Sequence, residues 1–150
     1  MRDDFLDVVL GRRGSDHVLI RVVDRMYPGA GDFWDGNWLT SPIAARIAGF
    51  TADLDAALRA DELCSFRKEL QNLHRKLRGS ARLVTLEEWI KVEVRCERNG
   101  HLEVEGELST SSPAHNRLRF SLPGLDQTDL VPLIDALLAI ERRFPVRGRS

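Results

Sequence analysis

Apolar and polar residues alternate with a period of two along much of this 150-residue chain. That period places successive side chains on opposite faces of a strand, so each such stretch predicts a half-buried β-strand. The stretches 6–10 and 18–22 flank a turn-rich segment and predict an N-terminal hairpin. Further strands are predicted around residues 81–85, 90–96, 102–108 and 118–122.

The segment 39–60 has two interpretations. Apolar residues alternate from Ile43 to Ile47 and again from Phe50 to Leu58, with a glycine between the two sets, which is typical of a tight hairpin. The alanines in this segment instead favour a helix, which Thr51 could cap. We favour the hairpin, because the alternation persists along both halves.

Two segments have the helical period. Over 62–78 the apolar residues form one stripe, with acidic residues at the N-terminal end, basic residues at the C-terminal end and Gly79 expected to end the helix. A second helix is predicted to begin near residues 126–128, with Thr128 as its N-cap, and to end at Phe144-Pro145.

The facing pattern fixes the register of the two strands that flank Asn99-Gly100. A two-residue turn would set Cys96 opposite Glu103 and mix an apolar face with a charged one. A three-residue loop over 98–100 instead pairs Cys96 with Leu102, and it requires Gly100 to adopt the left-handed conformation. We therefore predict the three-residue loop.

Together these elements predict an α+β fold, with an antiparallel sheet of seven to eight strands and two main helices packed on one face. Neither an internal repeat nor a linker interrupts the chain, so residues 1–150 are expected to form a single domain. Residues 1–4 and 147–150 are expected to be frayed.

Composition and charge exclude several classes of function. Hydrophobic residues at 43% and charged residues at 30% are typical of a soluble globular protein. A formal net charge of −1 argues against nucleic acid as a partner, and no apolar run is long enough for a membrane helix. The N-terminus lacks the pattern of a secretion signal, so a cytoplasmic location is expected.

Cys64 and Cys96 could pair on count alone, but buried free thiols are the favoured interpretation.

The sequence contains no strong catalytic or cofactor-binding motif. His101, Glu103 and Glu105 share one strand face and could hold a cation, although a solvated, charge-paired face is the favoured interpretation. The glycine-containing segments match neither a phosphate-binding loop nor a nucleophile elbow. We therefore expect no catalytic residues, no metal and no cofactor.

The most informative segment is the aromatic loop, residues 27–38, which carries four aromatic residues among three glycines and a proline. Its rings could form a satellite core, with Asp32 and Asp35 capping turns. Alternatively, tryptophan flanked by aspartate has the composition of a protein-binding hot spot. Trp38 is expected to lie buried in a strand. The candidate partner-binding residues are Phe33, Trp34, Asp32 and Asp35, together with Trp89 on the charged face of a later strand.

Several short strings resemble the WapI-type immunity proteins of bacteria. They are found at 33–39 (FWDGNWL), 86–90 (LEEWI), 100–104 (GHLEV), 116–120 (NRLRF), 126–128 (DQT) and 144–146 (FPV). The resemblance implies that the chain neutralises a cognate toxin domain by binding it in the cytoplasm of the producing cell, without catalytic residues. Two features depart from this pattern: Asp129 stands where an aromatic residue is expected, and the net charge is nearly neutral.

We therefore predict a non-enzymatic, protein-binding domain that acts as an immunity protein. One alternative is a small-molecule-binding or hydrolytic domain with a pocket under the aromatic loop. Another is a homodimeric module built on an uncovered strand edge or on the outer sheet face.

Overall fold

A computed structural model describes residues 6–110 and 114–150 of the chain. The helices of the described residues are α1 (Phe33–Gly36), α2 (Ala60–Lys76) and α3 (Leu130–Arg143), with 3₁₀ turns at Arg98–Gly100 and Gln127–Asp129. The strands are β1 (Leu6–Gly11), β2 (His17–Val22), β3 (Asp24–Arg25), β4 (Trp38–Thr40), β5 (Ile43–Ile47), β6 (Phe50–Leu54), β7 (Ala57–Arg59), β8 (Gly79–Val84), β9 (Ile90–Cys96), β10 (His101–Ser109) and β11 (Arg117–Asp126).

The strands pair antiparallel throughout, so the predicted α+β class with antiparallel strands is confirmed. They are divided among three sheets rather than joined in one. Two sheets have four strands, in the orders β1-β2-β5-β6 and β11-β10-β9-β8, and a small third sheet has the order β3-β4-β7. The alternation of apolar and polar residues gives each large sheet one apolar face. Two such sheets can bury their apolar faces together.

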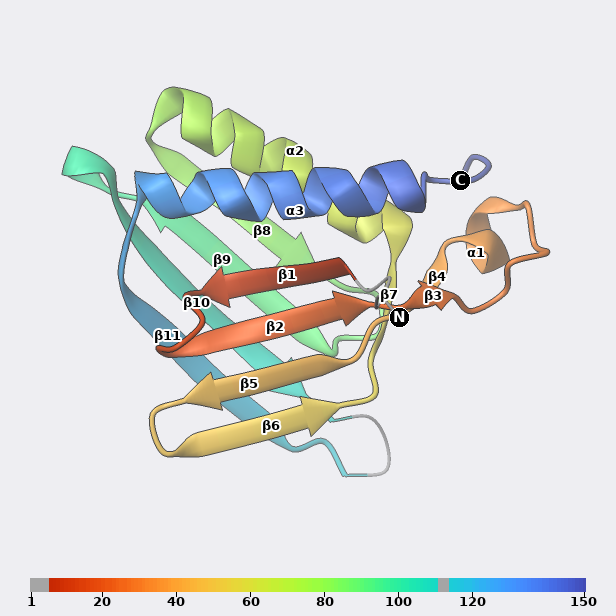
Figure 1. Ribbon diagram of the computed structural model, residues 1–150, viewed down its shortest axis with the longest axis horizontal. Coiled ribbons are helices and arrows are strands. Elements are labelled where there is room, and N and C mark those ends of the chain that lie inside the picture. Colours follow the sequence, from red (N-terminus) through yellow and green to blue (C-terminus); the bar gives the residue numbers. More distant parts are fainter. Residues whose placement is uncertain (1–5, 111–113) are drawn as a thin grey trace.

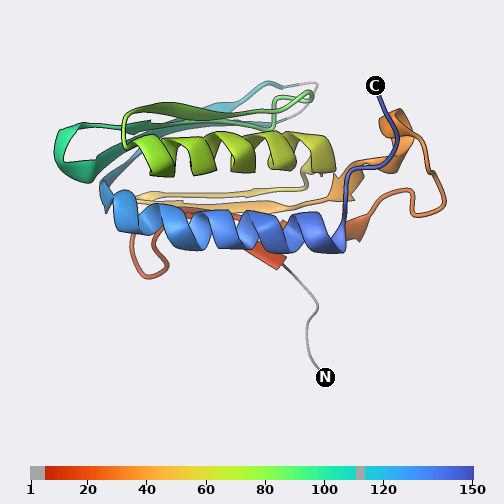
Figure 2. The ribbon, with the colours of Figure 1, turned by 90° about the horizontal axis from the view of Figure 1, so that it is seen from above.

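Both long helices run along one side of the two large sheets (Figure 1). Seen from above, the two sheets form separate layers (Figure 2). Helix α2 packs against β8, α3 packs against β1, and the helices contact each other. The helices therefore close one side of a shared core instead of covering the face of a single sheet. Helix α1 and the C-terminus lie at the same end of the molecule (Figure 1).

The three hairpin predictions are confirmed. The N-terminal hairpin, β1–β2, pairs Leu10 with Val18. The β5–β6 hairpin pairs Ile47 with Phe50, as the alternation requires. Strands β9 and β10 pair Cys96 with Leu102, and Gly100 has a φ of 77°. Both cysteines are free thiols, as predicted, but only Cys96 is buried, whereas Cys64 is half-buried.

Two predicted helix ends were wrong. Helix α2 ends at Lys76, and its C-cap, Leu77, adopts the left-handed conformation (φ 54°) and donates its N–H to the Leu73 carbonyl at 2.7 Å. Gly79 instead begins β8. The N-cap of α3 is Asp129 rather than Thr128, and the 3₁₀ turn that precedes this helix is capped by Asp126, whose carboxylate accepts the N–H of Thr128 at 2.8 Å. A carboxylate reaches the first free N–H groups as well as a threonine hydroxyl does, and the spacing alone did not distinguish the two.

Candidate functional site

The aromatic loop is an ordered unit built around the short helix α1. Asp32 caps the helix, because its carboxylate accepts the N–H of Asp35 at 3.0 Å. Trp38 begins strand β4, as predicted, and is half-buried. Trp34 projects outward, with 61% of its surface exposed. The two tryptophans of the loop therefore have different environments.

A buried arginine, Arg59, holds the rings of the aromatic loop in place. Its guanidinium donates to the carbonyls of Phe33 (2.6 Å) and Trp34 (2.7 Å) and to the carboxylate of Asp61 (3.0 Å). The guanidinium carbon lies 5.0 Å, 5.6 Å and 4.9 Å from the ring centroids of Phe33, Trp34 and Trp38. Arg59 is only 2% exposed. The space beneath the rings is therefore occupied by a positive charge with satisfied donors.

The C-terminal segment fastens the other side of the loop. Asn37 is fully buried, and its amide donates to the carbonyls of Phe33 (2.8 Å) and Arg147 (3.0 Å) and accepts the N–H of Arg147 (2.9 Å). The Arg147 guanidinium donates to the carbonyls of Pro28 and Ala30, both at 2.8 Å. Arg147 is thus anchored, which differs from the frayed tail expected for 147–150. The expectation for residues 1–4 lies outside the described residues.

A second buried arginine joins α1 to the end of α3. Arg25 donates to the carbonyls of Gly36 (2.6 Å) and Pro145 (2.5 Å), and its guanidinium carbon lies 5.8 Å from the ring centroid of Phe144. Burial, with a smaller contribution from nearby Arg147, lowers the pKa of Arg25. These contacts tie three segments that are distant in sequence into one support for Trp34.

Beside Trp34 lies an open groove of about 500 Å³, which we call the aromatic groove. It runs between the aromatic loop, the start of α2 and the segment 84–88. Three exposed apolar side chains line it: Trp34 (61% exposed), Val84 (64%) and Leu86 (63%). Exposed apolar side chains from separate segments that meet in one groove are typical of a binding surface.

Glu62 connects the two walls of the aromatic groove. Its carboxylate accepts the backbone N–H of Arg59 at 2.8 Å and, with its other oxygen, the backbone N–H of Leu86. Burial raises the pKa of Glu62, and these two hydrogen bonds oppose the rise. The 84–88 segment is thereby fixed relative to α2.

Residues 9–145 match the model of the immunity protein WapI-like family, which spans most of the chain. The chain belongs to the WapI-like immunity protein family. The resemblance predicted from the short sequence strings is confirmed. Neither a curated protein nor a solved structure shows significant similarity to the chain.

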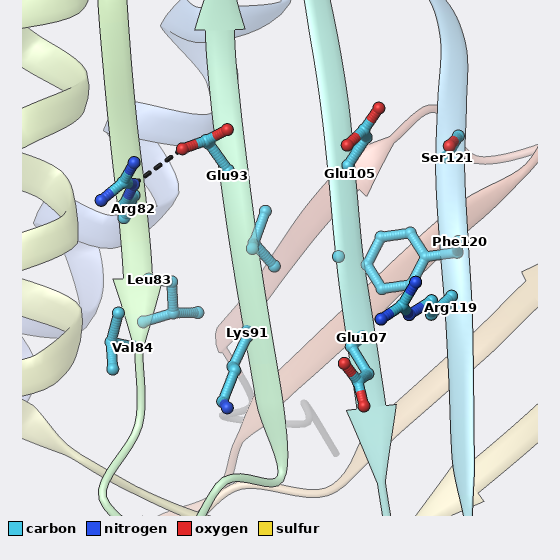
Figure 3. Close-up of a pocket in the computed structure, with 12 residues that line it drawn as sticks. Arg82, Leu83, Val84, Lys91, Glu93, Glu105, Glu107, Arg119, Phe120 and Ser121 are labelled. Carbon is cyan, nitrogen blue, oxygen red and sulfur yellow. Dashed lines mark hydrogen bonds and ion pairs between the residues drawn. The ribbon is translucent and has the colours of Figure 1, made fainter.

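The outer face of the β8–β11 sheet in this WapI-like protein carries a ladder of ion pairs. Figure 3 shows Arg82 directed toward Glu93, at 2.7 Å. Arg95 contacts Glu93 at 3.1 Å and also Glu103. Glu105 lies 3.8 Å from Arg95. Because Glu103 and Glu105 face an arginine, the charge-paired interpretation of this face fits better than a cation site. Within 6–110 and 114–150, no group of three His, Cys, Asp or Glu side chains could hold a metal ion.

The structure brings together four of the five predicted partner-binding residues in this WapI-like protein. Asp32, Phe33, Trp34 and Asp35 are consecutive around α1. Trp89 lies apart from them: it is half-buried, packs against the core and donates its indole N–H to Glu87 at 3.2 Å. Trp89 lies just before β9, which begins at Ile90, so the alternation of that strand did not fix the direction of its side chain.

Sequence reasoning missed the residues that support or complete the groove in this WapI-like protein. They are Arg25, Arg59, Glu62, Val84, Leu86 and Arg147. The only local signal was Glu62 placed three residues after Arg59, the spacing of a capping box. The other contacts join segments that are distant in the chain.

Among the described helices, none combines the length and apolarity that a membrane span requires.

Proposed function

We propose that this chain neutralises a cognate toxin domain by binding it directly, without catalysis, in the cytoplasm of the cell that makes the toxin. Membership of the WapI-like immunity protein family over residues 9–145 is the observation that carries this proposal. Phe33, Trp34, Asp32 and Asp35 are the proposed contact residues around α1, and Trp89, next to the 84–88 segment, is the fifth proposed contact residue.

The geometry of the aromatic loop supports a binding role over a pocket beneath the loop. The undersides of the three rings contact the Arg59 guanidinium, so a small molecule would have to displace a buried charge to lie there. The exposed Trp34 instead faces outward on a fixed support. A rigid, exposed tryptophan is a favourable anchor for protein binding, because little side-chain freedom is lost on association.

Co-expression tests the proposal. The chain is expressed in a bacterial host together with the C-terminal domain of the polypeptide encoded next to it, which is the candidate toxin. We expect the host to grow only when the chain is present, and both proteins to co-purify as a complex of unmodified chains by intact mass. If both proteins are soluble but growth does not recover and no complex forms, the proposal is wrong. A change in the mass of the toxin domain would instead indicate an enzyme.

A further inference from the structure

We propose that the aromatic groove is the docking site, and that it receives an apolar side chain surrounded by lysine or arginine residues on the partner protein. This inference rests on the proposed function, because it assigns the surface and the partner chemistry of the same binding event.

The aromatic groove leaves apolar side chains exposed to solvent. Trp34 comes from α1, Val84 from the end of β8, and Leu86 from the segment that follows it. Each is more than 60% exposed, yet all three line one groove. Covering such side chains with a partner removes apolar area from water, which contributes roughly 25 cal/mol for each Å² buried. The groove is therefore suited to an apolar side chain.

Exposed carboxylates lie next to these apolar residues in the chain. The exposed carboxylates of Asp32 and Asp35 flank the Phe33-Trp34 pair, and those of Glu87 and Glu88 follow Leu86 in sequence. The two cations that line the groove are both paired, and the pairing with Lys91 also offsets the charge of Glu88. The Lys91 ammonium lies 3.3 Å from Glu88, and the Arg59 guanidinium is buried against backbone carbonyls and Asp61. An acidic rim around an apolar floor attracts a basic surface and repels an acidic one.

Hydrogen bonds within the chain hold the walls of the aromatic groove together without a partner. Glu62 joins its two walls through the N–H groups of Arg59 and Leu86. Arg59 in turn holds the carbonyl of Trp34. A groove whose walls are hydrogen-bonded to each other loses little freedom on binding, so more of the interaction energy appears as affinity.

Single substitutions test the apolar floor in the complex with the candidate toxin domain. Trp34→Ala and Leu86→Ala are each expected to raise the Kd by about 30-fold or more, as truncation of a hot spot does. Phe50→Ala is the matched control, because Phe50 is 62% exposed at the β5–β6 turn, away from the groove. Its Kd should stay within about twofold of the native value. Circular dichroism and thermal unfolding of each variant verify that the fold is retained.

The outcomes separate this inference from the proposed function. If the native chain does not bind the toxin domain, the proposed function fails and the inference fails with it. If the native chain binds and the Trp34 and Leu86 variants bind as well as the Phe50 variant, the function stands and the groove is not the docking site.

Charge reversal tests the partner chemistry. The double variant Asp35→Lys/Glu88→Lys is expected to slow association by about tenfold at low salt, with a smaller effect at high salt, because salt screens exposed charges. Asp53→Lys is the control, since that carboxylate is 76% exposed on β6. An association rate for the double variant that equals or exceeds the native rate would overturn the assignment of a basic partner.

Discussion

Replacement of Arg59 by methionine tests the support of the aromatic loop most directly. Methionine retains most of the apolar stem but removes the guanidinium. The carbonyls of Phe33 and Trp34 would then lose their charged donor, and Asp61 would lose its ion pair. The three aromatic rings would also lose the cation that they surround.

The expected loss is about 3 kcal/mol in the free energy of unfolding. Hydrogen bonds to charged groups contribute about 1.5–3 kcal/mol each, and breaking a buried charged pair costs about 3–5 kcal/mol. The lower end applies here, because Asp61 is 29% exposed and water can reach the carbonyls once the loop opens. A loss of this size is a large part of the roughly 5–15 kcal/mol that stabilises a domain.

Urea unfolding measured by circular dichroism gives the free energy, and amide hydrogen exchange reports on the loop. We expect residues 33–38 to lose protection in the Arg59→Met variant, while the β9–β10 pair keeps it. Arg46→Met serves as the control, because its side chain is 51% exposed and its carboxylate partner lies 3.9 Å away. That variant should lose less than about 0.5 kcal/mol.

The reasoning is refuted if Arg59→Met stays within about 1 kcal/mol of the native protein while the loop amides remain protected. The rings would then be held by their own packing, and the buried guanidinium would be incidental. Arg59→Lys separates the effect of the positive charge from that of the planar guanidinium. Lysine keeps the charge, but its single ammonium group cannot bond to two carbonyls and a carboxylate as the guanidinium does. We therefore expect a partial loss of the free energy of unfolding.

Four other substitutions probe the two tryptophans, the sheet and the helix pair. Trp38→Ala should cost about 2 kcal/mol, because the ring is half-buried over Arg59, whereas exposed Trp34→Ala should cost under about 1 kcal/mol; equal losses in urea unfolding would contradict this difference. Gly106→Ala should cost about 2 kcal/mol, since the added carbon would lie 2.6 Å from a backbone oxygen of β9, and an unchanged melting temperature would show that the sheet adjusts freely. The hydrogen bond from Arg67 lowers the pKa of Glu141, so the stability it contributes is present above the usual pKa of 4.5 and is lost as pH falls through the lowered value. Glu141→Gln should therefore flatten the decline in unfolding free energy below about pH 5, and a decline as steep as the native one would exclude this pair as its source.

Local patterns predicted the elements whose partners are close in sequence. The β9–β10 register followed from the mismatch of Cys96 with Glu103, because a shift by one residue would expose an entire apolar face. The β5–β6 hairpin followed from alternation in the same way. Helix ends were less certain, because several residue types can satisfy the last free backbone groups. Leu77 rather than Gly79 is therefore the C-cap of α2.

The sequence by itself determined the α+β class, the antiparallel hairpins and the family, because apolar periodicity and short ordered strings are properties of neighbouring residues. Tertiary structure alone decided how the aromatic loop is used. The rings of Trp34 and Trp38 both lie over the buried Arg59, yet Trp34 is 61% exposed and Trp38 is half-buried. The position of the loop depends on contacts with Arg59, which is 25 residues from Trp34, and with Arg147, which is 110 residues from Asn37. Burial depends on contacts between distant segments, and a local pattern cannot specify those contacts.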